Sequence, residues 1–205
     1  MLLLALSAAF ALTTSAGADV SGGANHVVIA QNTTDGATIV NAGTQVVPTA
    51  GDTVTSANIA AAVNAACTGC HSTAVAVQIL IVHGSPSYFT PGNAAGAANG
   101  GCDGCGAFAF ARQHWIQVDG TTQLSGEARQ QVAVLRQEIS DTAASILPSD
   151  AATDPCLPTE ACSRDFQLNA ELMTLTDQLI QVVTDDLQSQ GDTTATLVDQ
   201  VQNQG

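Results

Sequence analysis

The sequence predicts an α+β protein in which a β-repeat domain over residues 19–120 precedes an antiparallel helical hairpin over residues 121–190. Three observations predict this class. The first stretch aligns with a shifted copy of itself, its apolar residues alternate with a period of two, and the acidic remainder carries apolar residues at three- and four-residue steps. Two or three repeat units would form either a short β-solenoid or a hairpin sheet.

The chain begins with a signal-like segment. Leu2–Leu12 form an apolar block, and Ala16, Gly17 and Ala18 fit the small-residue pattern of a signal peptidase site. We therefore predict a signal peptide over residues 1–18, although no basic residue precedes the block; a buried N-terminal strand is the alternative. The block is too short to span a bilayer, and no other apolar run is long enough. The mature chain is expected to be secreted or at the cell surface, without a membrane span.

The charge excludes two classes of partner. The formal net charge is -14, and the four basic residues are all arginines. Nucleic acids and anionic membrane surfaces attract clustered Lys and Arg, so binding to either is not expected. Thirteen of the 18 acidic residues lie from Glu127 onward, whereas the chain up to Gly120 is almost uncharged. This shift in composition predicts a boundary between the repeat and the helices.

An internal repeat organises the first part of the chain. A shift of 35 residues places Cys67 and Cys70 on Cys102 and Cys105 without a gap. The shift also aligns amides that are candidates for stacking between units: Asn58 with Asn93, Asn64 with Asn99, and Gln78 with Gln113.

A fainter copy precedes the two clear units. Asn32 corresponds there to Asn64, and Asp35 takes the place of Cys67. The chain therefore has up to three units.

Each unit is predicted to consist of a strand, a cysteine-bounded turn and a second strand. Residues 58–65 and 74–79 alternate with a period of two, although the alanines of residues 57–66 also allow a helix. The Thr-Gly and Asp-Gly pairs between the cysteines are typical of turns. Because one strand face holds only Ala, Asn and Gln, we expect close stacking with amide ladders. The alternative is an antiparallel sheet whose asparagines face solvent.

The sequence from Cys67 to His71 matches the attachment motif of haem c. The equivalent of His71 in the next unit is Gly106, although that unit keeps both cysteines. The repeat therefore requires the sulfur atoms and not the histidine, which disfavours haem.

The four repeated cysteines leave other roles open. Two Cys-x-x-Cys pairs have zinc-ribbon spacing, so Zn²⁺ held by four thiolates is one alternative and a redox dithiol is another. Export favours disulfides, because oxidising compartments convert such thiols. The disulfides would close each turn, as Cys67–Cys70 and Cys102–Cys105, or would bridge neighbouring strands, as Cys67–Cys102 and Cys70–Cys105.

Two helices are predicted in the acidic part, over Glu127–Leu147 and Arg164–Gln190, because apolar residues recur there on one face. A disulfide between Cys156 and Cys162 would staple the proline-rich connection, which gives an antiparallel hairpin. Residues 191–205 carry few apolar side chains and are expected to form a flexible tail.

The sequence shows no spacing typical of an enzyme: the zinc-protease, serine-hydrolase and phosphate-loop motifs are missing. The pattern Asn-x-Ala-x-Ala-x-Asn-x-x-Cys-x-x-Cys, followed by Ala-x-Ala-x-Gln, resembles a secreted repeat module of actinobacterial proteins named as peptide zinc metalloproteases. The resemblance covers roughly Asn25 to Leu187. The protease name belongs to a membrane portion outside this pattern, so no catalytic residue carries over.

The expectation is therefore an exported, non-enzymatic protein of the cell surface, stapled by disulfides, with a structural or protein-binding role. Its repeat strands would pair with a protein partner or with another copy. The alternative function is a zinc-binding or redox module built from the Cys-x-x-Cys pairs.

Overall fold

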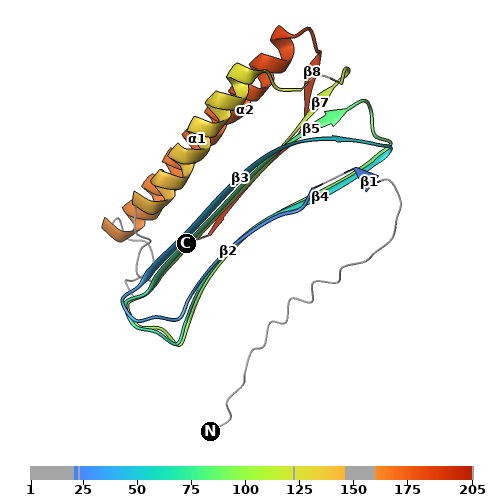
Figure 1. Cartoon of the computed structure of the whole chain (residues 1–205). Coiled ribbons are helices and arrows are strands. Elements are labelled where there is room, and N and C mark those ends of the chain that lie inside the picture. The colour runs from blue at the N-terminus through green and yellow to red at the C-terminus, as the bar shows by residue number, and fades with distance from the viewer. Residues whose placement is uncertain (1–20, 23, 122, 146–159, 205) are drawn as a thin grey trace.

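The computed structural model describes residues 21–22, 24–121, 123–145 and 160–204. The predicted signal peptide and the proposed Cys156–Cys162 bridge lie outside the residues whose side chains are described. The fold is α+β (Figure 1). Its elements are β1 (Ser21–Gly22), β2 (His26–Asn32), β3 (Thr38–Ala50), β4 (Thr53–Ala65), β5 (His71–His83), β6 (Tyr88–Gly100), β7 (Gly106–Val118), α1 (Gly126–Ser145), α2 (Glu160–Ser189) and β8 (Thr194–Gln204).

The strands form two separate sheets. In the first, here called the β4 sheet, β4 lies between β2 and β6, all parallel, and β1 also pairs with β4. In the second, the β5 sheet, β5 lies between β3 and β7, again parallel. The two strands on either side of each cysteine turn therefore enter different sheets. The expectation of a hairpin sheet is wrong, because β4 and β5 pair with their counterparts and not with each other.

The register agrees with the sequence alignment at every central position. Asn58 lies beside Asn93, and Gln78 beside Gln113. The fainter copy is also aligned, since Asn32 lies beside Asn64. Residues 57–66, for which a helix was the alternative, are in strand β4 over all but the last position, where Ala66 has a positive φ of 52°.

Small side chains fill the space between the two sheets. Alanines from both sheets form one buried cluster in the half of the stack nearer the cysteine turns. The other half holds larger residues, where Trp115, Leu80, Val82 and Val54 are fully buried together. Trp115 therefore belongs to the core, as do Phe108 and Phe110 on the opposite face of β7.

Both helices lie on the outer face of the β5 sheet (Figure 1). Ser125 caps α1 by accepting the Ala128 amide at 3.1 Å, and Gly191 ends α2 with a φ of 94°. The Ser125 amide donates to Asp186 near the end of α2, so the start of one helix meets the end of the other. Within the described residues, neither helix is long and apolar enough to cross a membrane.

The C-terminal segment differs from the expected flexible tail. Thr194–Gln204 form β8, which runs antiparallel to β7 at the edge of the β5 sheet. The segment has few apolar residues because it lies at an exposed edge, where backbone hydrogen bonds to β7 replace burial as the source of order. The chain thus returns from the helices to the sheet that precedes them.

Candidate functional site

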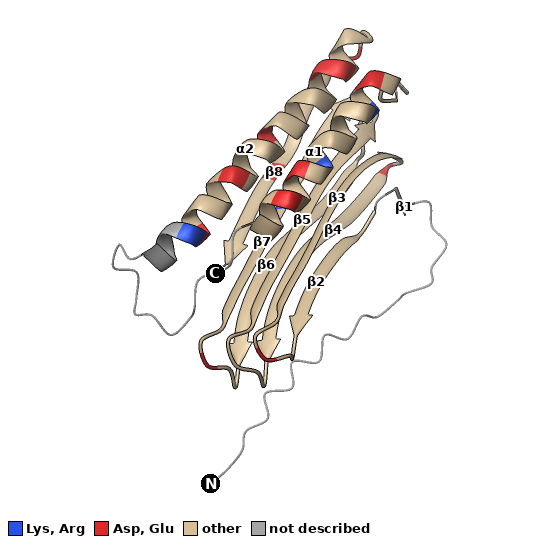
Figure 2. Cartoon of the chain, turned by 60° about the vertical axis from the view of Figure 1, so that its left-hand side comes forward, with Lys and Arg blue, Asp and Glu red and all other residues tan. Residues whose placement is uncertain are grey.

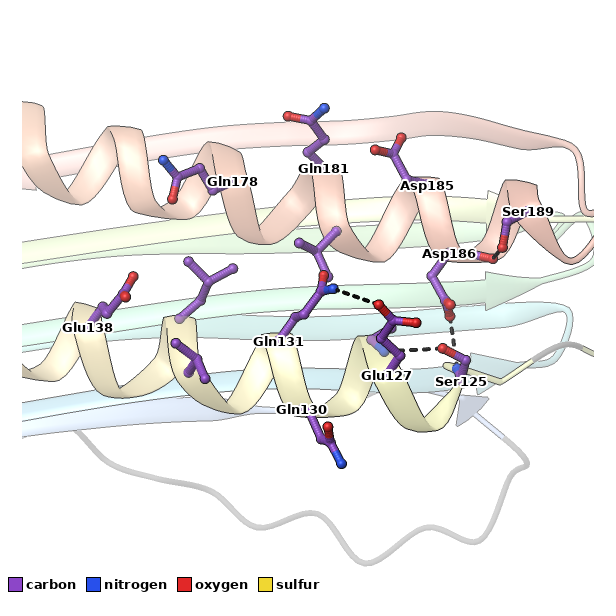
Figure 3. Close-up of a pocket in the computed structure, with 14 residues that line it drawn as sticks. Ser125, Glu127, Gln130, Gln131, Glu138, Gln178, Gln181, Asp185, Asp186 and Ser189 are labelled. Atoms are coloured by element: carbon purple, nitrogen blue, oxygen red, sulfur yellow. Dashed lines mark hydrogen bonds between the residues drawn. The ribbon is translucent and has the colours of Figure 1, made fainter.

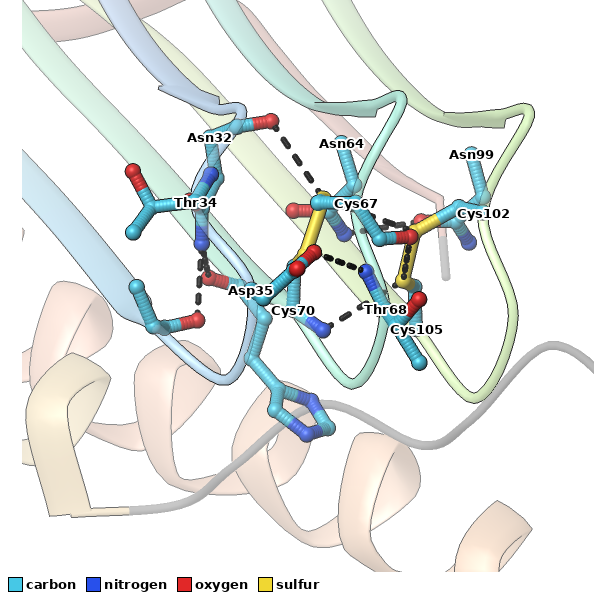
Figure 4. Close-up of a disulfide and its surroundings, with 12 residues drawn as sticks. Asn32, Thr34, Asp35, Asn64, Cys67, Thr68, Cys70, Asn99, Cys102 and Cys105 are labelled. Carbon is cyan, nitrogen blue, oxygen red and sulfur yellow. Dashed lines mark hydrogen bonds between the residues drawn. A yellow bond between two sulfur atoms is a disulfide. The ribbon is translucent and has the colours of Figure 1, made fainter.

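The cysteine turns are stacked on one another in the direction in which the strands pair, perpendicular to the strand axes. The Gly36 amide donates to Thr68 O, and the Gly69 amide to Asp103 O, each at 2.8 Å. Gly36, Gly69 and Gly104 each have a φ between 61° and 64°, a left-handed conformation that favours glycine. Three turns of one shape therefore lie above one another, of which two carry sulfur (Figure 4).

The four sulfur atoms of the repeated motif form one cluster. Cys67 is disulfide-bonded to Cys70, and Cys102 to Cys105. All four Sγ atoms lie within 4.8 Å of one another, and Cys67 Sγ is 3.6 Å from Cys102 Sγ. Cys67, Cys70 and Cys105 are buried, and Cys102 is half-buried. The cluster can therefore act as two structural bridges or, when reduced, as a set of four metal ligands.

The third turn replaces sulfur with a carboxylate. Asp35 Oδ1 accepts the Thr68 amide at 2.8 Å, so it caps the adjacent turn (Figure 4).

His71, the histidine of the haem-like motif, begins β5 and lies beside Gly106 of β7. The residue that pairs with His71 in the next unit is therefore a glycine and not a histidine, as the alignment of the two units had indicated.

Two asparagine ladders connect the strands of the β4 sheet. Asn58 Nδ2 donates to Asn93 Oδ1 at 2.9 Å, and Asn64 Nδ2 to Asn99 Oδ1 at 2.8 Å. The same Asn58 and Asn64 nitrogens also donate to backbone carbonyls of β5 or β7 across the interior. Each amide therefore joins neighbouring strands and also joins the two sheets. His26 occupies the first step of one ladder, with Nδ1 3.0 Å from Asn58 Oδ1.

A glutamine ladder runs through the β5 sheet. Gln113 Nε2 donates to Gln78 Oε1 at 2.8 Å, and Gln78 Nε2 donates to Gln45 Oε1 at 2.9 Å. Gln78 also accepts the Ser56 hydroxyl at 2.7 Å and donates to Ala24 O at 2.7 Å. Gln78 is fully buried, so this side chain satisfies both of its polar atoms inside the protein.

Sequence reasoning missed a buried ionic cluster around Arg112. Arg112 lies in β7 with 5% of its side chain exposed, and it contacts Asp177 of α2 at 2.6 Å and Asp199 of β8 at 3.1 Å. It also donates to Thr176 Oγ1 at 2.8 Å. Burial opposes the charge of Arg112, but hydrogen bonds and attraction from Asp199 and Asp177 raise its pKa above the ordinary value. The only signal in the sequence was a lone basic residue in an uncharged strand.

Two histidines, His26 and His114, have a lowered pKa. Burial lowers the pKa of His114, although Asp199, with Oδ1 3.4 Å from His114 Nδ1, opposes this shift. Burial likewise lowers the pKa of His26, against the hydrogen bond to Asn58. Both imidazoles are therefore held toward the neutral form.

The helices carry most of the charge, and the strands carry almost none (Figure 2). A shallow groove runs between α1 and α2 and is lined by polar and acidic residues (Figure 3). Two of its acidic side chains are hydrogen-bonded: Gln131 donates to Glu127, and Asp186 accepts the Ser125 amide and Gln190 Nε2. The groove is therefore described as the solvated surface between two helices.

Comparison with protein-family models, with curated protein sequences and with solved structures returns no match. The resemblance to a secreted repeat module therefore rests on the quoted sequence pattern alone.

Proposed function

We propose that the protein is an exported, non-enzymatic structural protein that binds a second copy of itself through the open edges of β2 and β3. The observation that carries the proposal is the in-register parallel stacking of strands, which stops at these two edges. Among the described strands, β2 pairs only with β4, and β3 only with β5. An edge strand with unpaired backbone groups readily accepts a further strand.

The stacking supports a short β-solenoid. Each unit contributes one strand to each sheet, and the turns at the cysteine end lie directly above one another. The amide ladders add hydrogen bonds along the stacking direction, so that one unit is a template for the next. A second copy would add its own edge strands to β2 and β3 through backbone hydrogen bonds. Because two identical ends meet across a two-fold axis, these strands would run antiparallel to β2 and β3, whereas β4 and β5 run parallel to them.

The opposite end of the stack is partly covered, because β7 has a paired strand there and β6, among the described residues, pairs only with β4. β8 pairs with β7, and its residues also reach β6: the Ala97 amide donates to Gln204 Oε1 at 2.9 Å, and Asn93 donates to Gln200 O at 3.0 Å. The helices cover a sheet face and not an edge. This end is therefore less open than the end formed by β2 and β3, which favours pairing of two copies by their β2 and β3 ends; such a pair closes without forming a fibre.

Two features support export. Disulfides such as Cys67–Cys70 and Cys102–Cys105 persist in oxidising compartments. Residues 1–18 have the composition of a signal peptide. We accordingly place the protein outside the cytoplasm, at the cell surface or secreted.

Sedimentation velocity of the full chain tests the pairing. The wild type should shift from monomer to dimer with increasing concentration, without larger species. In Val27→Lys/Ile29→Lys the shift should be lost, because both side chains are exposed on β2, at 46% and 53%, and a charged edge opposes strand addition. Val134→Lys, at a 57% exposed site on α1, is the matched control and should dimerise like the wild type.

Hydrogen exchange shows which strands take part. Dimerisation through the open edges predicts amide protection in residues 26–32 and 38–50 that increases with protein concentration. A wild-type protein that remains monomeric at every concentration would overturn the proposal. Dimerisation that survives the double lysine variant, or protection confined to the helices, would assign the interface elsewhere.

A further inference from the structure

The two cysteine turns have a second chemical state that the disulfides conceal. The Thr68 and Asp103 backbones form a parallel bridge, and the Gly69 amide bonds to Asp103 O. These backbone contacts hold the turns together without the disulfide bonds, since both disulfides lie within a turn. Reduction therefore frees four thiols that remain side by side.

The spacing of the sulfur atoms suits a tetrahedral metal ion. A Zn²⁺ ion with four sulfur ligands at about 2.3 Å requires sulfur–sulfur separations of about 3.8 Å. Cys67 Sγ and Cys102 Sγ are already 3.6 Å apart. The Cα atoms within each turn are 6.2 and 6.0 Å apart, which leaves room for the bonded sulfurs to separate by side-chain rotation once reduced.

The surroundings favour thiolates. The Cys70 amide donates to Cys105 Sγ at 3.3 Å, and an N–H group directed at sulfur stabilises its anionic form. Three of the four cysteines are buried, so water competes little for the ligand positions. Asp103 lies in one of these turns and Asp35 in the neighbouring third turn. Both are exposed, so water screens their repulsion toward a negatively charged centre.

We propose that, with both disulfides reduced, Cys67, Cys70, Cys102 and Cys105 bind one Zn²⁺ ion. Each disulfide accepts two electrons and two protons from a dithiol reductant, which is itself oxidised to a disulfide. The four resulting thiols lose their protons when the metal binds. A disulfide oxidant, which accepts two electrons for each bridge and is itself reduced to a dithiol, releases the ion and restores the two bridges. This end of the protein therefore has a disulfide state and a metal state. This site is independent of the open edges of β2 and β3.

Cobalt is the probe for this site. The full chain is reduced with a phosphine, the phosphine is removed under inert gas, and Co²⁺ is titrated in. The variant Cys156→Ser/Cys162→Ser should serve as the reference protein, because its only thiols are the four in question. We expect one equivalent of Co²⁺ to produce intense visible bands of tetrahedral geometry and thiolate charge-transfer absorption, both removed by one equivalent of Zn²⁺.

Three outcomes decide the proposal. Adding Cys67→Ser/Cys102→Ser to the reference protein should abolish both absorptions while the circular dichroism of the strands is retained. The oxidised reference protein should show no absorption, and re-oxidation of the loaded protein should release the metal. Weak bands of octahedral cobalt in the reduced reference protein, or binding that survives loss of Cys67 and Cys102, would overturn the proposal.

Discussion

β4 and β5 flank one cysteine turn and belong to one unit of sequence, yet their environments differ. β5 is buried without interruption from Ser72 to Val82, whereas β4 is buried only at alternate positions. The inner faces of both strands meet at the alanine layer. The outer face of the β5 sheet carries Val, Ile and Phe and lies under the helices. The outer face of the β4 sheet carries alanines together with Val27, Ile29 and Ile59, and no described helix covers it.

The two strands of one repeat unit therefore contribute differently to the fold. The β5 sheet supplies most of the apolar burial, and it holds the ionic contacts to α2 and β8. The β4 sheet contributes the asparagine ladders, and its outer face stays exposed. The larger apolar contacts are thus concentrated in one sheet, and the proposed dimer contact would include the edge strand β2 of the other.

Replacing a buried isoleucine in the β5 sheet and an exposed isoleucine in the β4 sheet should show the largest difference in stability between the two sheets. Ile79→Ala, at a fully buried site under the helices, should lower the free energy of unfolding by about 2–5 kcal/mol. Ile29→Ala, where 53% of the residue is exposed, should cost less than about 1 kcal/mol. Chemical denaturation followed by fluorescence of Trp115, the single tryptophan, measures both. Similar losses in the two variants would show that the β4 sheet is equally important for stability.

The glutamine ladder gives the next largest effect. Gln78→Leu keeps the volume but removes the hydrogen bonds of Gln78 to Ser56, Gln113 and Gln45, so we expect a loss of about 2–3 kcal/mol. Gln117→Leu is the control, because its hydrogen bonds to Gly84 and Ser85 are exposed, and should change stability by less than about 0.5 kcal/mol. Equal denaturation midpoints for Gln78→Leu and the wild type would mean that the ladder contributes no net stability.

The parts of the fold that the sequence predicted are those with a local signal. Alternation over residues 58–65 and 74–79 identified strands, and apolar spacing identified both helices within a few residues of their ends. The amides at Asn58, Asn64 and Gln78 were identified because they recur at one interval. Such patterns depend on neighbours along the chain, or on a copy of the same residues.

The features that were missed depend on contacts between dissimilar segments. Arg112 and Asp199 are 87 residues apart, and nothing in the repeat indicates an acidic partner for Arg112. β8 is mostly polar, and its apolar residues Leu197, Val198 and Val201 neither alternate regularly nor are fully buried, so the sequence does not distinguish it from a loop. Parallel pairing into two sheets also follows from the whole stack, since each strand alone would fit a hairpin equally well.

The link between the β5 sheet and β8 is expected to be of intermediate strength. Asp199→Asn should lower the free energy of unfolding by about 1–2 kcal/mol, because buried Arg112 keeps Asp177 but loses one of its two carboxylates. The partial exposure of Asp199, at 40% of its side chain, reduces this effect. Asp141→Asn on the exposed side of α1 should be neutral. A wild-type denaturation curve for Asp199→Asn would show that Asp177 alone neutralises Arg112.

The smallest expected effect is the pH dependence of the free energy of unfolding that one histidine from each sheet contributes. Burial lowers the pKa of His26 in β2 and of His114 in β7 below the ordinary 6.5, so the unfolded chain binds more protons than the folded protein below that pH. Stability should therefore be complete above about pH 6.5 and decline as the pH falls toward the lowered values, with a slope of at most about 1.4 kcal/mol per pH unit for each histidine. The lowered pKa of Asp199 affects stability only near and below its ordinary value of 3.8, so denaturation measured between pH 7 and 5 reports on the histidines.

His114→Gln should flatten this decline more than His26→Gln, because His114 is buried and His26 is half-buried. An unchanged slope in His114→Gln, or stability that rises on acidification, would contradict the assignment of neutral imidazoles to both sheets.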